Sequence, residues 1–354
     1  MIMVTAERLI RELKKPRAYP DPVGQIKFVQ THISWVFITE RFAYKVKKPV
    51  NFGFLDFSTL EKRNFYCHRE IELNKRLAPE VYLGVCPVTE HNGSIRIMEL
   101  GVDSAEFENT QKEDVVEYCV KMKRIPDNVL MRTAFDKGGL GSKDLINIAR
   151  TIAEFHRTAR GSGEIDHFGT LDVVKFNTDE NFEQTREFVD RSISMDQYEA
   201  IKNWTGEFYR KHIGVFKERI RSKKIRDCHG DLHMEHVCLT EPISIIDCIE
   251  FNDRFRYSDT ASDIAFLIMD LEYNHGEDLA AELYLSYLEH SNETDVELFD
   301  LLLNFYKVYR SYVRGKVISF QLNDPDIPEE GKALAAAVAG KYFELACKYI
   351  IESD

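Results

Sequence analysis

The chain has 354 residues, of which 44% are hydrophobic and 30% charged. This composition is ordinary for a globular enzyme, and the length suffices for two lobes with separate cores. A net charge of −12 without a long basic stretch argues against a nucleic-acid partner. No apolar run reaches the length of a membrane span, so no membrane partner is expected.

The N-terminal segment MIMVTAERLIRELKK carries acidic residues and lacks a long apolar core, so we do not expect it to be a signal peptide. The seven cysteines are scattered, odd in number and without a CxxC pair. This pattern favours a reducing, cytoplasmic location. Cys228, Cys238 and Cys248 stand beside several histidines, but their wide spacing favours small buried side chains over a zinc site.

Residues 1 to 122 predict a mixed region of strands with one helix. Trp35–Ile38 and Phe42–Val46 form a predicted hairpin, and a helix is expected from Leu60 to Leu77, stopped by Ala78-Pro79. A second hairpin around His91-Asn92-Gly93 is expected from the segments 81–88 and 94–100, followed by a strand at 115–122.

Residues 123 to 354 are predicted to be mostly helical. Apolar residues recur at helical spacing in the segments 143–158, 179–223, 262–290, 295–320 and 328–351. The strands expected in this region are the two short apolar runs on either side of Pro242. The change in pattern, rather than a flexible linker, places the boundary between the two regions near residue 122.

The most informative segment is CHGDLHMEHVCLTEPISIIDCIE, residues 228 to 250. Asp231 lies in a loop before the first short strand, and Asp247 ends the second. These positions would place one carboxylate opposite the other across a cleft. A carboxylate at 231 can orient a hydroxyl or accept its proton, and one at 247 is a hard ligand suited to Mg²⁺. This layout meets the needs of phosphoryl transfer from a nucleotide.

His236 follows Asp231 by five residues, where a kinase-type loop normally carries asparagine. Imidazole is a softer ligand and a poorer match for Mg²⁺ than an amide oxygen. His236 is therefore either a metal ligand or a histidine that stabilises the loop. Glu235 and Glu250 are nearby carboxylates that would compensate.

Lys45 and Glu70 form a predicted pair. On a strand, Lys45 shares a face with Ala43, and an inward ammonium there would meet nucleotide phosphates. Lys47 lies two residues further along and would share this face. The alternative is that Lys45 is a surface lysine in a basic run. Glu70 lies on the inward stripe of the helix at 60–77, so it is preferred to Glu72 as the partner of Lys45.

Asp263, in SDIAF, begins an apolar helix. The helix dipole favours a carboxylate there, and Asp263 would also brace the loop around Asp231 through backbone amides. Neither GxGxxG nor a Walker motif precedes the first strand, where Thr31-His32-Ile33-Ser34 stands instead. Phosphate contacts would have to come from hydroxyls, backbone amides and Lys45.

The motifs HGDLHMEHV, IIDCIEF and SDIAF, together with Lys45, Glu70 and the segment VKMKRIP, resemble the aminoglycoside phosphotransferase and choline kinase-like family. The resemblance implies an α+β, bilobal protein-kinase-like fold, with a small β-sheet lobe that carries one key helix and a larger, mostly helical lobe. Residues 1–122 would be the nucleotide-binding lobe and residues 123–354 the catalytic and substrate lobe.

The resemblance also implies roles for single residues. ATP would bind between the lobes, with Lys45 and Glu70 at its phosphates and Met122 and Lys123 at the hinge. Asp231 would be the catalytic base. Asp247 would bind Mg²⁺, joined by His236 in the position where the family usually has asparagine.

We therefore expect an ATP-dependent kinase that phosphorylates a hydroxyl of a small molecule, and the acidic chain suits a cationic acceptor. Two alternatives remain. His236 motivates a nucleotide-binding pseudokinase with a regulatory role. The dense group of His229, Asp231, His233 and His236 motivates a metal-dependent hydrolase.

Overall fold

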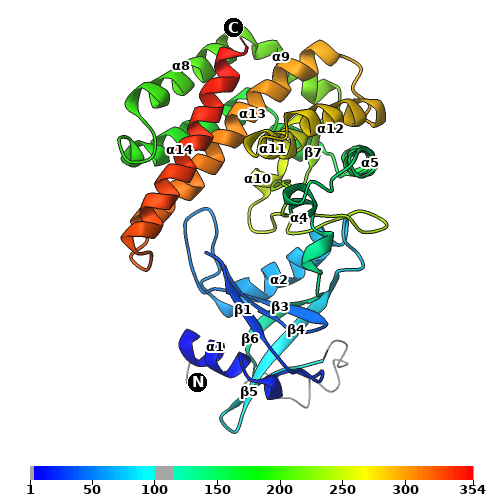
Figure 1. Cartoon of the computed structure of the whole chain (residues 1–354), viewed down its shortest axis with the longest axis vertical. Coiled ribbons are helices and arrows are strands. Elements are labelled where there is room, and N and C mark those ends of the chain that lie inside the picture. Colours follow the sequence, from blue (N-terminus) through cyan, green and yellow to red (C-terminus); the bar gives the residue numbers. More distant parts are fainter. Residues whose placement is uncertain (1–3, 100–114, 354) are drawn as a thin grey trace. The chain divides into compact units, whose positions relative to one another are not determined.

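The computed structural model describes residues 4–99 and 115–353 (Figure 1). The chain divides into two compact units. The first unit comprises residues 1–133 and 238–252, and the second comprises residues 134–237 and 253–354. The segment after the loop at 228–236 thus returns to the first unit. The functional division expected at residue 122 stays a prediction.

The first unit is built on a six-stranded antiparallel sheet with the strand order β1-β2-β3-β6-β4-β5. Its strands are β1 (Lys27–Gln30), β2 (Ser34–Ile38), β3 (Phe42–Lys47), β4 (Tyr82–His91), β5 (Ser94–Ile97) and β6 (Val115–Lys123). Both predicted hairpins are present, β2 with β3 and β4 with β5. Residue 100, where the second hairpin was expected to end, lies outside the described residues.

Strand alternation gives this sheet two different faces. Tyr44 and Val46 are fully buried in an apolar cluster with Phe37 and with Leu13 of α1 (Ala6–Leu13). Successive side chains alternate along a strand, so Lys45 and the residues two positions away from it point to the opposite face. Charged side chains of β3 are thus directed away from this apolar cluster.

Helix α2 (Leu60–Asn74) packs against β4 and β6. Its N-cap Thr59 accepts a hydrogen bond from the backbone N–H of Lys62 at 3.3 Å, which satisfies one of the free donors at the helix start. The helix ends three residues earlier than expected. Ala78 precedes a proline and is therefore disfavoured in helical conformation, so the chain leaves the helix through a short turn.

A two-stranded sheet of β8 (Val237–Cys238) and β9 (Ser244–Ile245) flanks Pro242, as predicted, although both strands are shorter than the apolar runs. Leu239 N–H donates to the carbonyl of Val129 at 2.7 Å, and Ile245 N–H donates to the carbonyl of Leu77 at 3.3 Å. These bonds attach the returning segment to the rest of the first unit.

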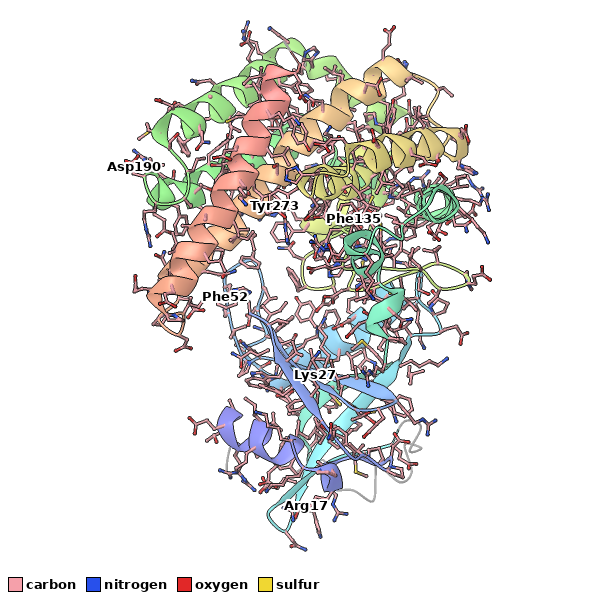
Figure 2. The ribbon with its side chains drawn as sticks, viewed as in Figure 1. Arg17, Lys27, Phe52, Phe135, Asp190 and Tyr273 are labelled. Atoms are coloured by element: carbon pink, nitrogen blue, oxygen red, sulfur yellow. The ribbon has the colours of Figure 1, made fainter. Side chains whose placement is uncertain are left out.

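The second unit is mostly helical. Its longer helices are α5 (Ser142–Thr158), α7 (Leu171–Thr185), α8 (Met195–Lys211), α9 (Ile213–Arg221), α11 (Thr260–Tyr273), α12 (Glu277–His290), α13 (Val296–Ser319) and α14 (Glu329–Ile351). Helix α11 is buried along nearly its whole length. It packs against α12 and α13, and α13 also packs against α14, so α11 forms the centre of the core. In Figure 2 Tyr273 of α11 is labelled, and its ring stacks on Tyr342 of α14 with the centroids 3.7 Å apart.

Two strands of the second unit were not predicted. β7 (Ile225–Asp227) pairs antiparallel with β10 (Tyr257–Asp259). Each has three residues, which is too short to show a period of two. In the described ranges, no helix combines the length and the apolar character that crossing a membrane would require.

Candidate active site

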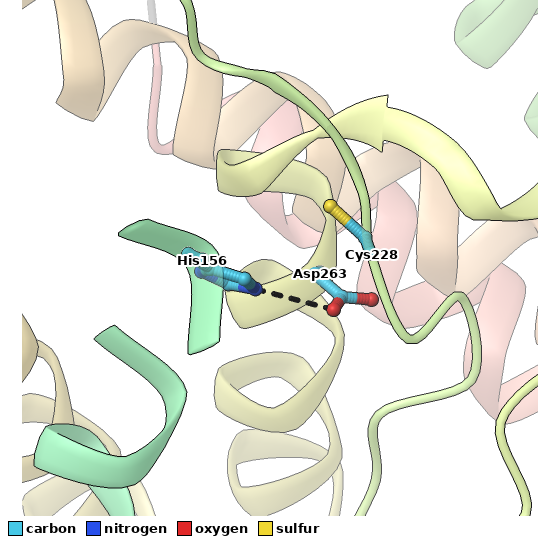
Figure 3. Close-up of side chains that lie close together, drawn as sticks. All are labelled: His156, Cys228 and Asp263. Atoms are coloured by element: carbon cyan, nitrogen blue, oxygen red, sulfur yellow. Dashed lines mark hydrogen bonds and ion pairs between the residues drawn. The ribbon is translucent and has the colours of Figure 1, made fainter. Parts of the chain in front are cut away.

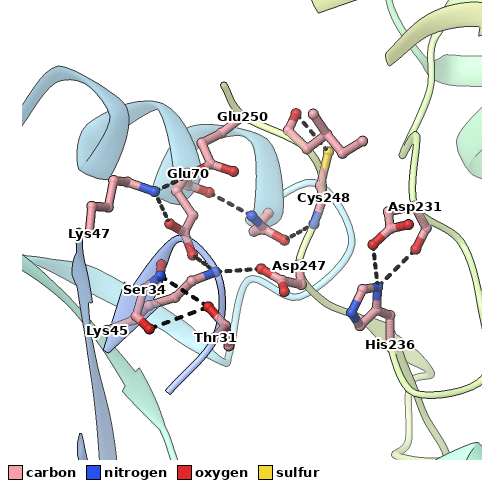
Figure 4. Close-up of polar contacts among 12 residues, drawn as sticks. Thr31, Ser34, Lys45, Lys47, Glu70, Asp231, His236, Asp247, Cys248 and Glu250 are labelled. Atoms are coloured by element: carbon pink, nitrogen blue, oxygen red, sulfur yellow. Dashed lines mark hydrogen bonds and ion pairs between the residues drawn. The ribbon is translucent and has the colours of Figure 1, made fainter. Parts of the chain in front are cut away.

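Lys45 lies between two carboxylates of the first unit (Figure 4). Its ammonium is 3.0 Å from Oε1 of Glu70 on α2 and 2.5 Å from Oδ1 of Asp247. Burial works against the charge of Lys45, but Asp247 and Glu70 outweigh it and hold its pKa well above the ordinary value. The structure therefore brings together three of the residues singled out in the sequence, and Lys45 stays protonated.

Asp247 follows β9 in left-handed backbone conformation, with φ of 62°. Aspartate tolerates this region better than most residues. Its backbone N–H donates to the hydroxyl of Tyr82 at 3.0 Å. The side chain is 44% exposed, in contrast to the fully buried Glu70. A solvent-accessible carboxylate on a fixed backbone has the donor type that Mg²⁺ prefers, so Asp247 fits a magnesium ligand.

The loop that carries Asp231 belongs to the second unit. Oδ2 of Asp231 lies 3.5 Å from Nε2 of His233 and 3.6 Å from Nδ1 of His236. Burial alone would raise the pKa of Asp231, but the charge and hydrogen bond of His233, followed by the charges of His236 and Arg314, lower it well below its usual range. Asp231 is therefore an ionised carboxylate at neutral pH.

His236 folds back onto the loop. Its Nδ1 is 2.8 Å from the backbone carbonyl oxygen of Asp231 (Figure 4). A carbonyl oxygen can only accept, so Nδ1 carries the proton and the lone pair of a neutral ring is on Nε2. This contact shows the loop-stabilising alternative, and the role of His236 as a metal ligand stays a prediction. One nitrogen stabilises the loop, and the other has the electronic character of a ligand.

Asp263 of α11 holds the loop at 229–231 in place. Its two oxygens accept the backbone N–H groups of His229 at 2.9 Å and Gly230 at 2.8 Å. The predicted bracing of the loop by Asp263 is therefore confirmed. Arg310 of α13 adds a third contact by donating to the carbonyl of Gly230 at 2.9 Å, and the sequence gave no signal for this arginine.

Figure 3 shows the surroundings of Asp263, with His156 of α5 and Cys228 close to it. His156 Nε2 is 3.2 Å from Oδ2 of Asp263, and its Nδ1 is 2.9 Å from the hydroxyl of Tyr287. His156, Cys228 and Asp263 are near enough to share a metal ion. Both nitrogens of His156 already have protein partners, so we interpret this group as a structural hydrogen-bond network.

Met122 and Lys123 end β6, beside Phe42 and Ala43 in the sheet register. The backbone N–H of Lys123 donates to the carbonyl of Val81 at 2.8 Å, and its ammonium lies 3.1 Å from Glu80. The structure does not bring Met122 and Lys123 into the Lys45 cluster. Their role at a nucleotide stays a prediction.

A tight turn replaces a glycine-rich loop between β1 and β2. The backbone N–H of Thr31 donates to the carbonyl of Ser34 at 2.9 Å, and the Thr31 hydroxyl accepts the N–H of Ser34 at 3.0 Å. Ser34 Oγ is buried and has no hydrogen-bond partner within residues 4–99 and 115–353. Ser34 begins β2, the strand that pairs with β3 and its Lys45, and Thr31 lies in the turn before it.

Two residues of this site were not chosen from the sequence. Lys47 donates a hydrogen bond to Oε2 of Glu70 at 2.6 Å, and it also donates to Glu250. Both partners are buried. The parity shared by Lys45 and Lys47 was the available signal, but a lysine in a basic run is normally exposed. Glu250 was noted only as a neighbouring carboxylate.

The sequence has relatives among mycobacterial proteins, while no family model matches it. It is 32% identical over 334 residues to the uncharacterized protein Mb2027c of Mycobacterium bovis and to the uncharacterized protein Rv2004c of Mycobacterium tuberculosis. The match covers 93% of this chain and 61% of each relative. This chain therefore spans less than two thirds of the length of these relatives.

The solved structures that align with this chain include small-molecule kinases and phosphotransferases. The GDP complex of aminoglycoside 2'-phosphotransferase-IIIa aligns with a TM-score of 0.50 at 11% identity, covering 94% of both chains. An ethanolamine kinase of Plasmodium vivax gives 0.47 at 13% identity, over 93% of this chain and 81% of the other. A choline/ethanolamine kinase family protein of Mesorhizobium loti gives 0.44 at 12% identity, over 91% and 92%.

At these identities the comparison defines the fold, and the aminoglycoside 2'-phosphotransferase-IIIa match carries that conclusion. A curled antiparallel sheet with one packed helix and a separate helical unit is the architecture expected from the resemblance in the sequence. The chain therefore has the protein-kinase-like fold of the aminoglycoside phosphotransferases.

Proposed function

We propose that this protein is an ATP-dependent phosphotransferase that moves the γ-phosphate to a hydroxyl group of a small molecule. The observation that carries the proposal is the position of Lys45 between Glu70 and Asp247, at 3.0 and 2.5 Å. A charged lysine held by a buried glutamate beside an exposed carboxylate is the arrangement that phosphoryl transfer uses for phosphates and metal.

In this mechanism Lys45 pairs with the phosphates, and Glu70 keeps its ammonium in place. Asp247 would hold Mg²⁺, which supplies neutralisation of the phosphate charge when bound. Asp231 orients the acceptor hydroxyl and takes up its proton as the hydroxyl oxygen bonds to the γ-phosphorus, while the bond from that phosphorus to the bridging oxygen breaks and ADP leaves. The ionised state of Asp231 at neutral pH supports this role. His236 is a second candidate ligand through Nε2, and Met122 and Lys123 would contact the base of the nucleotide.

The acceptor is proposed to be a small hydroxyl compound, with a cationic group favoured by the net charge of −12. We place the protein in the cytoplasm, a location that seven free cysteines support. The test is ADP formation from ATP and Mg²⁺ across a panel of amino alcohols, amino sugars and neutral sugars. Turnover that depends on one acceptor class supports the proposal. Mg²⁺-dependent ATP binding without turnover on the whole panel favours a pseudokinase.

One observation favours a second candidate. Asp231, His233 and His236 can each offer a ligand atom, and these atoms lie within 4.8 Å of one another. Two histidines and a carboxylate suit a transition metal better than Mg²⁺. This geometry fits a metal-dependent hydrolase. Metal analysis of the purified protein discriminates the two, because only the hydrolase requires stoichiometric, tightly bound Zn²⁺, Mn²⁺ or iron.

A further inference from the structure

Lys47 is a fully buried lysine with two carboxylate partners. Its ammonium donates to Oε2 of Glu70 at 2.6 Å and to Oε1 of Glu250, and it lies 4.8 Å from the centre of the Phe57 ring. Removing an ammonium and two carboxylates from water costs several kcal/mol per ion, and well-packed apolar residues often stabilise a core as well or better. Stability alone therefore gives a weak reason for this buried group.

Glu70 connects Lys47 to Lys45. Its Oε1 faces Lys45 at 3.0 Å and its Oε2 faces Lys47 at 2.6 Å. The result is a continuous chain of ion pairs, which Figure 4 shows: Asp247, Lys45, Glu70, Lys47 and Glu250. Both ends of this chain lie in the same short segment, residues 247–250. Two ammonium groups and three carboxylates leave one negative charge in excess, so the cluster suits an added cation.

The segment 247–250 has further attachments to α2. Cys248 N–H donates to Oδ1 of Asn74 at 2.9 Å, and Asn74 Nδ2 donates to the carbonyl of Glu70 at 2.9 Å. Tyr82 accepts the N–H of Asp247 at 3.0 Å. The backbone of Asp247 and Cys248 is thus fixed by α2 and β4. The side chain of Asp247 has Lys45 as its partner in the ion-pair chain.

A phosphate group at Lys45 would compete with Asp247 for the same ammonium. A metal ion at Asp247 would likewise compete with Lys45. The contact between Lys45 and Asp247 must therefore loosen when both ligands bind. The contacts of Lys47 with Glu70 and Glu250 do not take part in this exchange, because all three side chains are buried. They can hold the segment in place while the contact between Lys45 and Asp247 opens.

We propose that Lys47 and Glu250 are positioning residues, whose buried ion pair through Glu70 holds the segment 247–250 so that Asp247 can bind a divalent cation. This inference rests on the proposed function. Neither residue touches the nucleotide in this account. They act through Glu70 and through the backbone of the segment, in the way that residues behind a metal ligand tune its affinity.

The test uses the double variant Lys47→Met/Glu250→Gln of the full chain. Changing both partners avoids an unpaired buried charge, which a single change would create. The matched control is Lys121→Met. Lys121 is also buried and ion-paired, at 2.7 Å from Asp21, but it lies opposite Tyr44, on the other face of the sheet.

Two measurements are made on each protein. The first is hydrogen exchange of the peptide that covers residues 245–252, without ligand. The second is the Mg²⁺ concentration that gives half of the maximal binding of a fluorescent ATP analogue. In the double variant we expect faster exchange in this peptide and a requirement for about tenfold more Mg²⁺. The affinity for the analogue at saturating Mg²⁺ and both values for Lys121→Met should stay near those of the wild type.

The outcomes separate this inference from the proposed function. If the wild type binds the analogue only with Mg²⁺ and the double variant needs the same Mg²⁺ concentration, the positioning role is overturned. The proposed function then stands. Unchanged exchange at 245–252 in a folded double variant also overturns it. A wild type without Mg²⁺-dependent binding rejects the proposed function and, with it, this inference.

Discussion

His156 and Asp263 form a buried hydrogen-bonded pair in which His156 Nε2 lies 3.2 Å from Oδ2 of Asp263. The same carboxylate accepts two backbone N–H groups of the loop that carries Asp231. Burial works to raise the pKa of Asp263, but the hydrogen bond and charge of His156 outweigh it and lower the pKa well below the ordinary value. A fixed anion at this point therefore determines the conformation of the loop.

The first prediction concerns this carboxylate. Asp263→Asn replaces one acceptor oxygen by an amide that would face a backbone N–H, donor against donor. We expect a loss of about 1–3 kcal/mol in the free energy of unfolding, measured by urea denaturation. Asp295→Asn is the control, because Asp295 caps α13 through Leu298 N–H at 3.0 Å and asparagine caps a helix equally well. Equal effects of the two substitutions would contradict the bracing role.

The second prediction concerns the proposed base. Asp231→Asn keeps the shape of the side chain and removes its ability to accept a proton. Turnover with the acceptor found by screening should fall by about 10²–10⁴-fold, while ATP binding stays near that of the wild type. Kinetics and a binding titration measure the two quantities. Asp196→Asn, at an exposed position of α8, should change neither. Full activity of the Asp231 variant would reject this residue as the base.

The third prediction concerns His236. An asparagine oxygen is a harder ligand than imidazole and suits Mg²⁺ better. If His236 lies at the metal, His236→Asn should lower the Mg²⁺ concentration needed for nucleotide binding. His290→Asn is a matched control, since His290 Nδ1 also lies close to a backbone carbonyl, that of Ser286 at 2.7 Å. An unchanged Mg²⁺ requirement in His236→Asn would assign His236 to the loop alone.

The fourth prediction is a pH dependence of stability. Lys316 of α13 donates to Asn181 at 2.6 Å and Gln184 at 2.8 Å. Burial lowers its pKa from 10.5 to about 8. Between these values the unfolded chain binds a proton that the folded protein does not, so the contribution of Lys316 to stability rises with pH. It is complete above the unfolded pKa and is lost as the pH falls through the folded one.

Lys316→Met removes this titration. The difference in free energy of unfolding between wild type and variant should therefore shift in favour of the wild type from about pH 7 to about pH 9.5, by about 2 kcal/mol. Urea denaturation at the two pH values measures it. A difference that is independent of pH would show that Lys316 is not held in a desolvated environment.

Part of this architecture could be predicted from the sequence. The hairpin of β2 and β3 follows from alternation, because one face is apolar and buried. Helices α5, α8, α9 and α11 to α14 of the second unit follow from their apolar periodicity, whereas the short helices and the start of α7 were not predicted. β7 and β10 could not be found, since three residues carry no period. The early end of α2 at Asn74 depends on the turn before Pro79, which the apolar pattern does not reveal.

The candidate site shows the same division. The pairing of Lys45 with Glu70 and the contact of Asp263 with the loop follow from residue type and position along an element. Lys47 and Glu250 could not be assigned to the site from the sequence, because lysines are rarely buried. The free energy of burying a charged lysine is offset only by partners that tertiary structure brings near it. Arg310 is similar, since α13 reaches the carbonyl of Gly230 through packing between elements distant in sequence.

The most direct test of the central claim is the melting temperature of the wild type with ATP, in the presence and absence of Mg²⁺. A ligand that binds only the native state raises this temperature by mass action. The proposed kinase site predicts a rise that requires Mg²⁺. A rise with ATP alone would favour the pseudokinase, and no rise at millimolar ATP would contradict the nucleotide site at Lys45 and Asp247.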